Sequence, residues 1–269
     1  MKNNLFDRKN RILLKELVKT DFKLRYQGSV LGMLWSVLKP LMLFAIMYLV
    51  FVQFLKFGAG IPHFAVSLLL GITVWTFFSE STIQGMTAIV SRGDLMRKIN
   101  FPRYIVVISA TISALINLAI NLVVVFILAV INGVDFQWHI LFIPIILIEL
   151  YVFSLGLAFL LSALYVKFRD LSHIWDVVMQ AAFYATPIIY PIAMIAAFSV
   201  EASKLFLLSP MTQMIQDMRY FIVYNGTETA WNYIGNIWLA VIPVVIVIII
   251  AVFGWLYFSK NSKRFAEII

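Results

Sequence analysis

The sequence predicts an all-α membrane protein with six transmembrane helices. Of its 269 residues, 62% are hydrophobic and 13% are charged, whereas soluble domains are about 45–50% apolar and about 25% charged. The apolar residues also gather in runs of about 20 or more, which is the length needed to cross the hydrocarbon core. This composition excludes a soluble enzyme and a disordered chain. The absence of cysteine excludes a disulfide scaffold and a thiolate metal site.

Six apolar runs are long enough to be considered as spans. The fifth is the shortest and ends in the sequence TPIIYP, Thr186–Pro191, whose prolines break helical hydrogen bonding. The segment 192–233 that follows is expected to form short external re-entrant helices that gate the exit, because its apolar part is shorter than a full crossing and contains Glu201 and Lys204. The predicted transmembrane domain is 30–269, with spans at about 30–55, 64–90, 104–131, 140–167, 174–190 and 234–258.

The distribution of Lys and Arg residues indicates how the chain is oriented in the membrane. If both termini are cytoplasmic, the segments on that side hold seventeen of the 21 Lys and Arg residues, with Lys56, Lys204 and Arg219 outside and Lys39 within the first span. This distribution obeys the positive-inside rule. A seventh span would place the cluster Lys260–Arg264 outside. Because the basic residues are divided among membrane-flanking segments, the net charge of +8 does not indicate nucleic acid as a partner.

Residues 1–29 are predicted to form an amphipathic helix that lies in the headgroup layer. Two stripes run side by side at four-residue spacing, apolar Leu14, Val18 and Phe22 and cationic Lys15, Lys19 and Lys23. An apolar side toward the membrane and lysines toward anionic lipid are typical of interfacial helices.

The loop of residues 91–103, between the second and third spans, is short and charged. Leu95, Met96 and Ile99 can share one face of a short helix, which Pro102 then stops. An apolar surface with a charged rim suits docking to a cytoplasmic partner. The residues alone equally allow a charged turn that only fixes topology.

Six motifs follow one another along most of the chain: Gly28–Pro40, Gly71–Phe78, Arg97–Arg103, Phe168–Leu171, Thr186–Pro191, and Ser209–Thr212 leading to Arg219. In this order they resemble one family, the membrane subunits of ATP-binding-cassette exporters of cell-surface polysaccharides, which include O-antigen and teichoic-acid export permeases. Ser209 departs from the Asn-Pro that is more usual in the last motif.

The resemblance implies a homodimer in the bacterial cytoplasmic membrane that exports a lipid-linked polysaccharide or polyol-phosphate polymer, with two copies of a separate ATPase subunit. The chain has no G-x-x-x-x-G-K-[ST] phosphate loop, so ATP and Mg are expected on the partner and no cofactor in this chain. By this resemblance, the loop of residues 91–103 corresponds to the coupling helix, which sits in a cleft of the ATPase subunit. The residues assigned to ATPase coupling are Asp94, Leu95, Met96, Arg97, Lys98, Ile99, Phe101 and Arg103, with Arg169 and Asp170, which we expect to form a salt bridge.

Aromatic side chains of the first and fifth spans are candidates for contact with the glycan, because sugars pack their C–H faces on aromatic rings. The resemblance places these two spans at the translocation pathway. Membrane-interface belts remain an alternative for Trp35 and Tyr190, and plain packing for the others. The candidates are Trp35, Phe44, Tyr48, Phe51, Phe183, Tyr184 and Tyr190.

Two other classes of function remain as alternatives. An intramembrane glycosyl or acyl transferase needs convergent His, Asp or Glu residues, but His63, His139 and His173 lie on different loops or span ends. A drug or ion transporter is expected to carry charges at mid-depth, and only Glu80 and Glu149 are candidates. For these two we prefer a carboxyl hydrogen-bonded to a neighbouring helix, or a span boundary misplaced by one turn.

Overall fold

The computed structural model describes residues 8–26, 28–29, 31–99, 101–262 and 265. These residues contain helices and no strand, which confirms the all-α prediction for the part of the chain described. Among them, five helical segments are long and apolar enough to cross a membrane. They are Trp35–Phe54, Phe64–Ser91, Tyr104–Ile131, Trp138–Lys167 and Ile237–Asn261.

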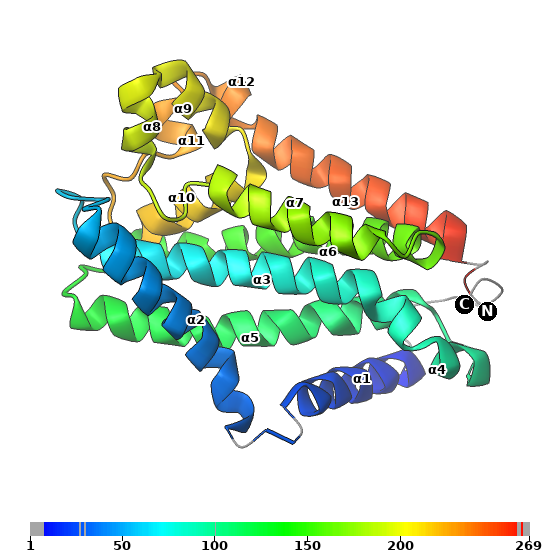
Figure 1. Ribbon diagram of the computed structural model, residues 1–269. Coiled ribbons are helices and arrows are strands. Elements are labelled where there is room, and N and C mark those ends of the chain that lie inside the picture. Colours follow the sequence, from blue (N-terminus) through cyan, green and yellow to red (C-terminus); the bar gives the residue numbers. More distant parts are fainter. Residues whose placement is uncertain (1–7, 27, 30, 100, 263–264, 266–269) are drawn as a thin grey trace.

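A bundle of four helices forms the core. Helix α3 (Phe64–Ser91) lies at its centre and packs against α5 (Tyr104–Ile131) and α6 (Ile143–Lys167), and α13 (Ile242–Asn261) packs against α6 (Figure 1). Most of α3 is buried within the single chain. The short helix η3 (Trp138–Phe142) leads into α6. The predicted runs 64–90, 104–131 and 140–167 therefore correspond closely to observed helices.

Small residues bring these helices close together. A Cβ added to Gly254 of α13 would lie 2.1 Å from the carbonyl oxygen of Gly156 of α6, and one added to Gly85 of α3 would lie 2.4 Å from the Cβ of Ala158. Elsewhere along α3 and α6, the rings of Phe78 and Phe153 stack with their centroids 5.3 Å apart. Close backbone approach at small residues is the usual way that helices pack tightly in a bilayer.

The amino-terminal segment forms α1 (Arg8–Tyr26), as predicted, although residues 1–7 lie outside the described part. Helix α1 packs against α5 and buries Leu17. Lys15, Lys19 and Lys23 are exposed. The cationic stripe therefore faces away from the protein, and its position in the headgroup layer stays a prediction.

Very few residues of the first span are fully buried in the single chain. After the short turn η1 (Gly32–Leu34) it consists of α2 (Trp35–Met47) and a π-helix, η2 (Tyr48–Phe54). Helix α2 contacts α3 and α5, and large apolar side chains along it, including Met42 and Ile46, are exposed. A span with so little burial needs lipid or another protein surface around it.

The fifth run folds as α7 (Leu171–Ala185) and ends before the prolines. Pro187 has no N–H to continue the helix, so the last residues of the predicted run 174–190 form a turn. At 15 residues, α7 is shorter than the roughly 20 residues that a full crossing needs. The indole of Trp175 donates a hydrogen bond of 3.2 Å to Thr82 of α3.

Short helices occupy the segment between α7 and α13. Four of them, α8, α9, α11 and α12, lie together at one end of the bundle, whereas α10 contacts α3, α6 and α13 and is largely buried (Figure 1). Their bounds are α8 (Ile192–Phe198), α9 (Val200–Leu207), α10 (Pro210–Ile222), α11 (Ala230–Tyr233) and α12 (Ile237–Ala240).

The two ends of the bundle differ. We call the end with these short helices the α8 end. The other is the α4 end, where α4 (Gly93–Lys98), the start of α1, the α6–α7 connection and the end of α13 lie (Figure 1). Arg103, which precedes α5, donates a hydrogen bond to the carbonyl of Ser262, which follows α13. This bond holds the end of α13 beside the start of α5.

Candidate functional site

Helix α4 forms a small projection at the α4 end. Asp94 lies in its first turn and Arg97 in its last, where they suit the helix dipole, and the two side chains approach to 3.9 Å. Both are exposed, as is Lys98. Ile99, which follows the helix, is 51% exposed. This surface combines one apolar side chain, Ile99, with charged side chains around it.

Two residues of the predicted docking set face the protein. Met96 and Phe101 pack against a hydrophobic cluster formed by the ends of α3, α5, α6 and α13, which includes Ile89, Val107 and Phe159. Leu95 is half-buried. The expectation of one apolar face with Leu95, Met96 and Ile99 together is therefore wrong. Met96 and Phe101 hold the loop to the bundle, and Ile99 projects from it.

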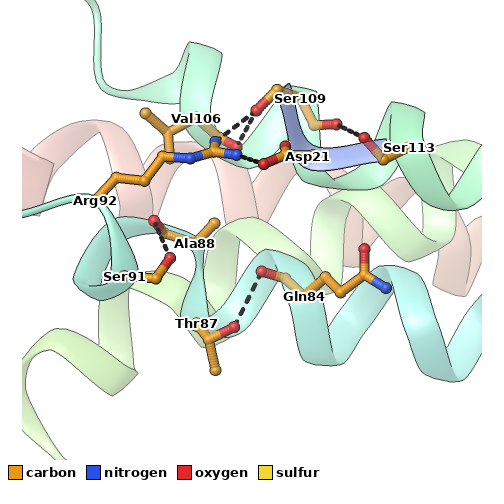
Figure 2. Close-up of polar contacts among 9 residues, drawn as sticks. All are labelled: Asp21, Gln84, Thr87, Ala88, Ser91, Arg92, Val106, Ser109 and Ser113. Carbon is orange, nitrogen blue, oxygen red and sulfur yellow. Dashed lines mark hydrogen bonds and ion pairs between the residues drawn. The ribbon is translucent and has the colours of Figure 1, made fainter. Parts of the chain in front are cut away.

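Arg92 fixes the base of α4. It lies between α3 and α4, pairs with Asp21 of α1, and donates a hydrogen bond of 2.8 Å to the hydroxyl of Ser109 of α5 (Figure 2). The Ser109 hydroxyl in turn donates to the carbonyl of Val106 at 2.8 Å. Burial lowers the pKa of Arg92 from its usual value because desolvation disfavours the charged form. The pairing with Asp21 offsets this cost.

Sequence reasoning missed this network. Its only sequence signal is Asp21, an acidic residue between Lys19 and Lys23 of the cationic stripe. The partner of such a residue is set by how α1 packs on α5, which the helical period alone does not specify.

Arg169 and Asp170 lie between α6 and α7 and are exposed, but they do not interact as expected. Among the ion pairs of residues 8–262 that the structure describes, none joins these two. The guanidinium of Arg169 instead lies over the ring of Tyr165, 5.3 Å from its centroid. A cation stacked on an aromatic one helical turn away satisfies Arg169 without Asp170. The predicted salt bridge is therefore wrong.

The predicted aromatic residues form two groups. Phe44 and Tyr48 are neighbours along the first span, with ring centroids 5.7 Å apart, whereas Phe183 and Tyr184 of α7 are 5.4 Å apart. The first span and α7 both contact α3 (Figure 1). Trp35 is 42% exposed and Tyr184 is 55% exposed. The remaining members are half-buried, namely Phe44, Tyr48, Phe51, Phe183 and Tyr190.

A polar cavity of about 450 Å³ lies between α2, α3 and α5. Trp35 is one of its lining residues, and Lys39, Glu80 and Gln84 line it as well. Asn117 of α5 donates a hydrogen bond of 3.1 Å to Glu80, so this carboxyl bonds a neighbouring helix as the sequence interpretation preferred. Sequence reasoning did not predict the cavity, because its polar residues come from three separate spans.

The comparisons with known proteins agree with this architecture. Residues 12–223 match the family described as ABC-2 type transporter. The chain belongs to this family. Curated relatives include an O-antigen export system permease protein, RfbA, of Myxococcus xanthus, 33% identical over 203 residues that cover 76% of this chain and 77% of the relative. Two proteins of the same name from Klebsiella pneumoniae are 29% and 28% identical, each covering 96% of this chain and 95% of the relative.

Hydrogen bonds from one buried arginine hold together the α8 end of this ABC-2 family chain. Arg219 of α10 is buried and donates hydrogen bonds to the carbonyls of Ser67 at 3.2 Å and of Pro187 and Ile188 at 2.8 Å. It therefore joins α10, α3 and the turn after α7. A Cβ added to Gly71 would lie 2.9 Å from its guanidinium. The sequence placed Arg219 in the external segment but did not indicate its burial.

Proposed function

We propose that this chain is the transmembrane subunit of an ATP-driven exporter that moves a lipid-linked cell-surface polysaccharide or polyol-phosphate polymer across the bacterial cytoplasmic membrane. Family membership and relatives whose names describe O-antigen export permeases support this proposal. The chain itself acts in transport, and ATP with Mg binds to a separate ATPase subunit, two copies of which serve one complex.

The construction of α4 is the observation that carries the proposal. Its tip, Ile99 with Asp94 and Arg97, is exposed, while its base is tied to α1 and α5 through Arg92. A rigid projection of this kind can receive a movement from a partner and pass it to two helices. ATP-driven closure of the ATPase dimer then biases the membrane helices between two arrangements.

The basic residues at the α4 end indicate how the chain is oriented in the membrane. The basic residues predicted to be cytoplasmic belong to segments that meet there, so the positive-inside rule directs this end to the cytoplasm. We infer six spans, in which α7 and the turn Thr186–Pro191 together complete the fifth crossing. The segment 192–233 then forms external re-entrant helices, and both termini are cytoplasmic.

A homodimer explains the exposed surfaces of α2 and α7. Met42 and Ile46 of α2 and Val177 of α7 are exposed in the single chain. A second copy placed against these helices would enclose Trp35 and Tyr184 between the two subunits. Their rings would then line a pathway for the glycan, which needs stacking surfaces but no tight fixed site.

Reconstitution of the chain with its ATPase in liposomes tests the proposal. We expect lipid-linked polysaccharide to stimulate ATP hydrolysis and to be transported, whereas the matched lipid carrier without glycan gives neither. Hydrolysis that is indifferent to every lipid-linked glycan, together with transport of a small hydrophobic drug, would instead indicate the drug-transporter alternative.

A further inference from the structure

A second cavity, of about 430 Å³, lies near the α8 end and away from the surfaces assigned to transport. Its walls come from the first turns of α6 and α13 and from α10 and α11. Most of the lining is apolar and includes Ile145, Ile148 and Ile248. Ile145 is 62% exposed, so the cavity opens at a surface of the bundle that is suited to hydrocarbon.

The inner wall of this cavity is acidic. Glu149 of α6 and Asp217 of α10 both line it, together with Gln213. Gln213 is 1% exposed and Asp217 3%. The Gln213 amide donates a hydrogen bond of 2.5 Å to Asp217 and also contacts Glu149. The two carboxyl groups therefore share one neighbour. None of the lining residues is Lys, Arg or His.

Three buried oxygen atoms in this wall lack a hydrogen-bond partner. They are Oε1 of Glu149, Oε1 of Gln213 and Oδ1 of Asp217. Buried acceptors without a donor are costly and uncommon in folded proteins. The other oxygen of Asp217 accepts from Gln213 and, at 3.1 Å, from the indole of Trp231. Burial raises the pKa of Asp217 to about 6, although these two donors act to lower it. Asp217 therefore stays largely ionised at pH 7, and the wall presents negative charge as well as unpaired acceptors.

The missing partner should therefore be a donor with positive charge. A primary ammonium has three N–H donors and one positive charge, which matches three acceptors beside a carboxylate pair. A quaternary ammonium has no N–H donor. The head of a lipid-linked glycan carries phosphate but no ammonium to pair with these carboxyl groups, so this cavity is unsuited to the head of the exported substrate.

We propose that this cavity binds a bilayer lipid that has a primary ammonium head, with the ammonium at Glu149, Gln213 and Asp217. The acyl chain lies along the isoleucine-lined mouth. Because the cavity is at the α8 end, the lipid belongs to the external leaflet if the orientation proposed above is correct. Lipid at this position would bridge α10 and α11 to α6 and α13.

Native mass spectrometry of the purified full chain, exchanged into equimolar phosphatidylethanolamine and phosphatidylcholine, tests the proposal. We expect the unsubstituted protein to retain phosphatidylethanolamine over phosphatidylcholine by about tenfold, the ratio expected from one charge-assisted hydrogen bond. Asp217→Asn and Glu149→Gln should each abolish this preference. Glu80→Gln, which removes a carboxylate from the cavity between α2, α3 and α5, should keep the preference for phosphatidylethanolamine. Equal retention of the two lipids by the unsubstituted protein would overturn the proposal.

Ile145→Trp provides a variant that leaves the carboxyl groups intact. The larger ring at the exposed mouth should obstruct the acyl chain and lower phosphatidylethanolamine retention to the level of phosphatidylcholine. If this variant retains the lipid as before, the cavity is not its site. Soluble ethanolamine, added as a competitor, should displace no lipid, because it lacks the apolar chain. Displacement would show a site for free amines and would contradict a lipid site.

Discussion

Asp21 of α1 pairs with Arg92 at the base of α4, and the same guanidinium bonds Ser109 of α5 (Figure 2). One side chain therefore joins the amino-terminal helix, the exposed loop and a membrane helix. Movement of α4 cannot leave α1 and α5 unaffected while these bonds hold. If an ATPase docks at α4 as proposed, the network gives a physical route from it to the bundle.

Asp21→Asn should destabilise the α4 end. The substitution leaves the partly buried Arg92 without its counter-charge, and we expect a loss of about 1–3 kcal/mol in the free energy of unfolding. Thermal unfolding of the detergent-solubilised protein measures this change. Asp94→Asn is the matched control, because the Asp94–Arg97 pair is exposed, and it should cost less than about 1 kcal/mol. Equal shifts would show that the Asp21 pair has no special role.

Ile99→Asp should uncouple ATP hydrolysis from export while the protein remains inserted. The side chain of Ile99 is 51% exposed, so its replacement removes little packing within the chain and mainly changes the docking surface. Hydrolysis and glycan export by the reconstituted complex measure the effect. Met96→Asp should instead lower the amount of folded protein, because Met96 packs into the cluster at the α4 end. Full export by Ile99→Asp would exclude α4 as the docking element.

Tyr184→Ala should lower polymer export more than it lowers abundance in the membrane. The ring is exposed on α7, so little packing is lost within the chain, whereas a stacking surface for sugars is removed. Export normalised to immunodetected protein is the measurement. Trp238→Ala, at an exposed aromatic of α12, serves as the control and should keep normal export. Equal losses of export and abundance for Tyr184→Ala would indicate packing alone.

Gly254→Ala should separate α6 from α13. The new methyl group would lie 2.1 Å from a backbone carbonyl of Gly156, and backbone cannot move aside as a flexible side chain can. We expect a cost of at least about 1–3 kcal/mol, seen as a lower unfolding temperature. Gly133→Asn is the comparison, because that site is open and Asn tolerates its positive φ. An unchanged unfolding temperature in Gly254→Ala would contradict this contact.

Length and hydropathy predicted the helices α3, α5 and α6 closely, because each is one uninterrupted apolar run. They could not predict the burial of α10. Gln213, Asp217 and Arg219 suggest an exposed helix, yet Arg219 is satisfied by carbonyls of residues 67, 187 and 188, far away in sequence. Long-range hydrogen bonds of this kind leave no local periodic signal.

The candidate site was predictable only in part. The sequence indicated a short charged helix in the loop 91–103 and the residues that compose it. It could not show which side faces outward, since six residues give too few turns to define a face. Met96 is turned inward by a cluster from four different helices. Arg92 was missed because its partners lie on α1 and α5.

Labelling of single cysteines in intact spheroplasts tests the proposed sidedness most directly. The chain contains no cysteine, so Lys98→Cys at α4 and Phe198→Cys at α8 each supply the only thiol. A membrane-impermeant maleimide should label Phe198→Cys in intact spheroplasts and Lys98→Cys only after lysis. Labelling of Lys98→Cys before lysis would place α4 outside the cell, where no ATPase can drive it, and would contradict the account.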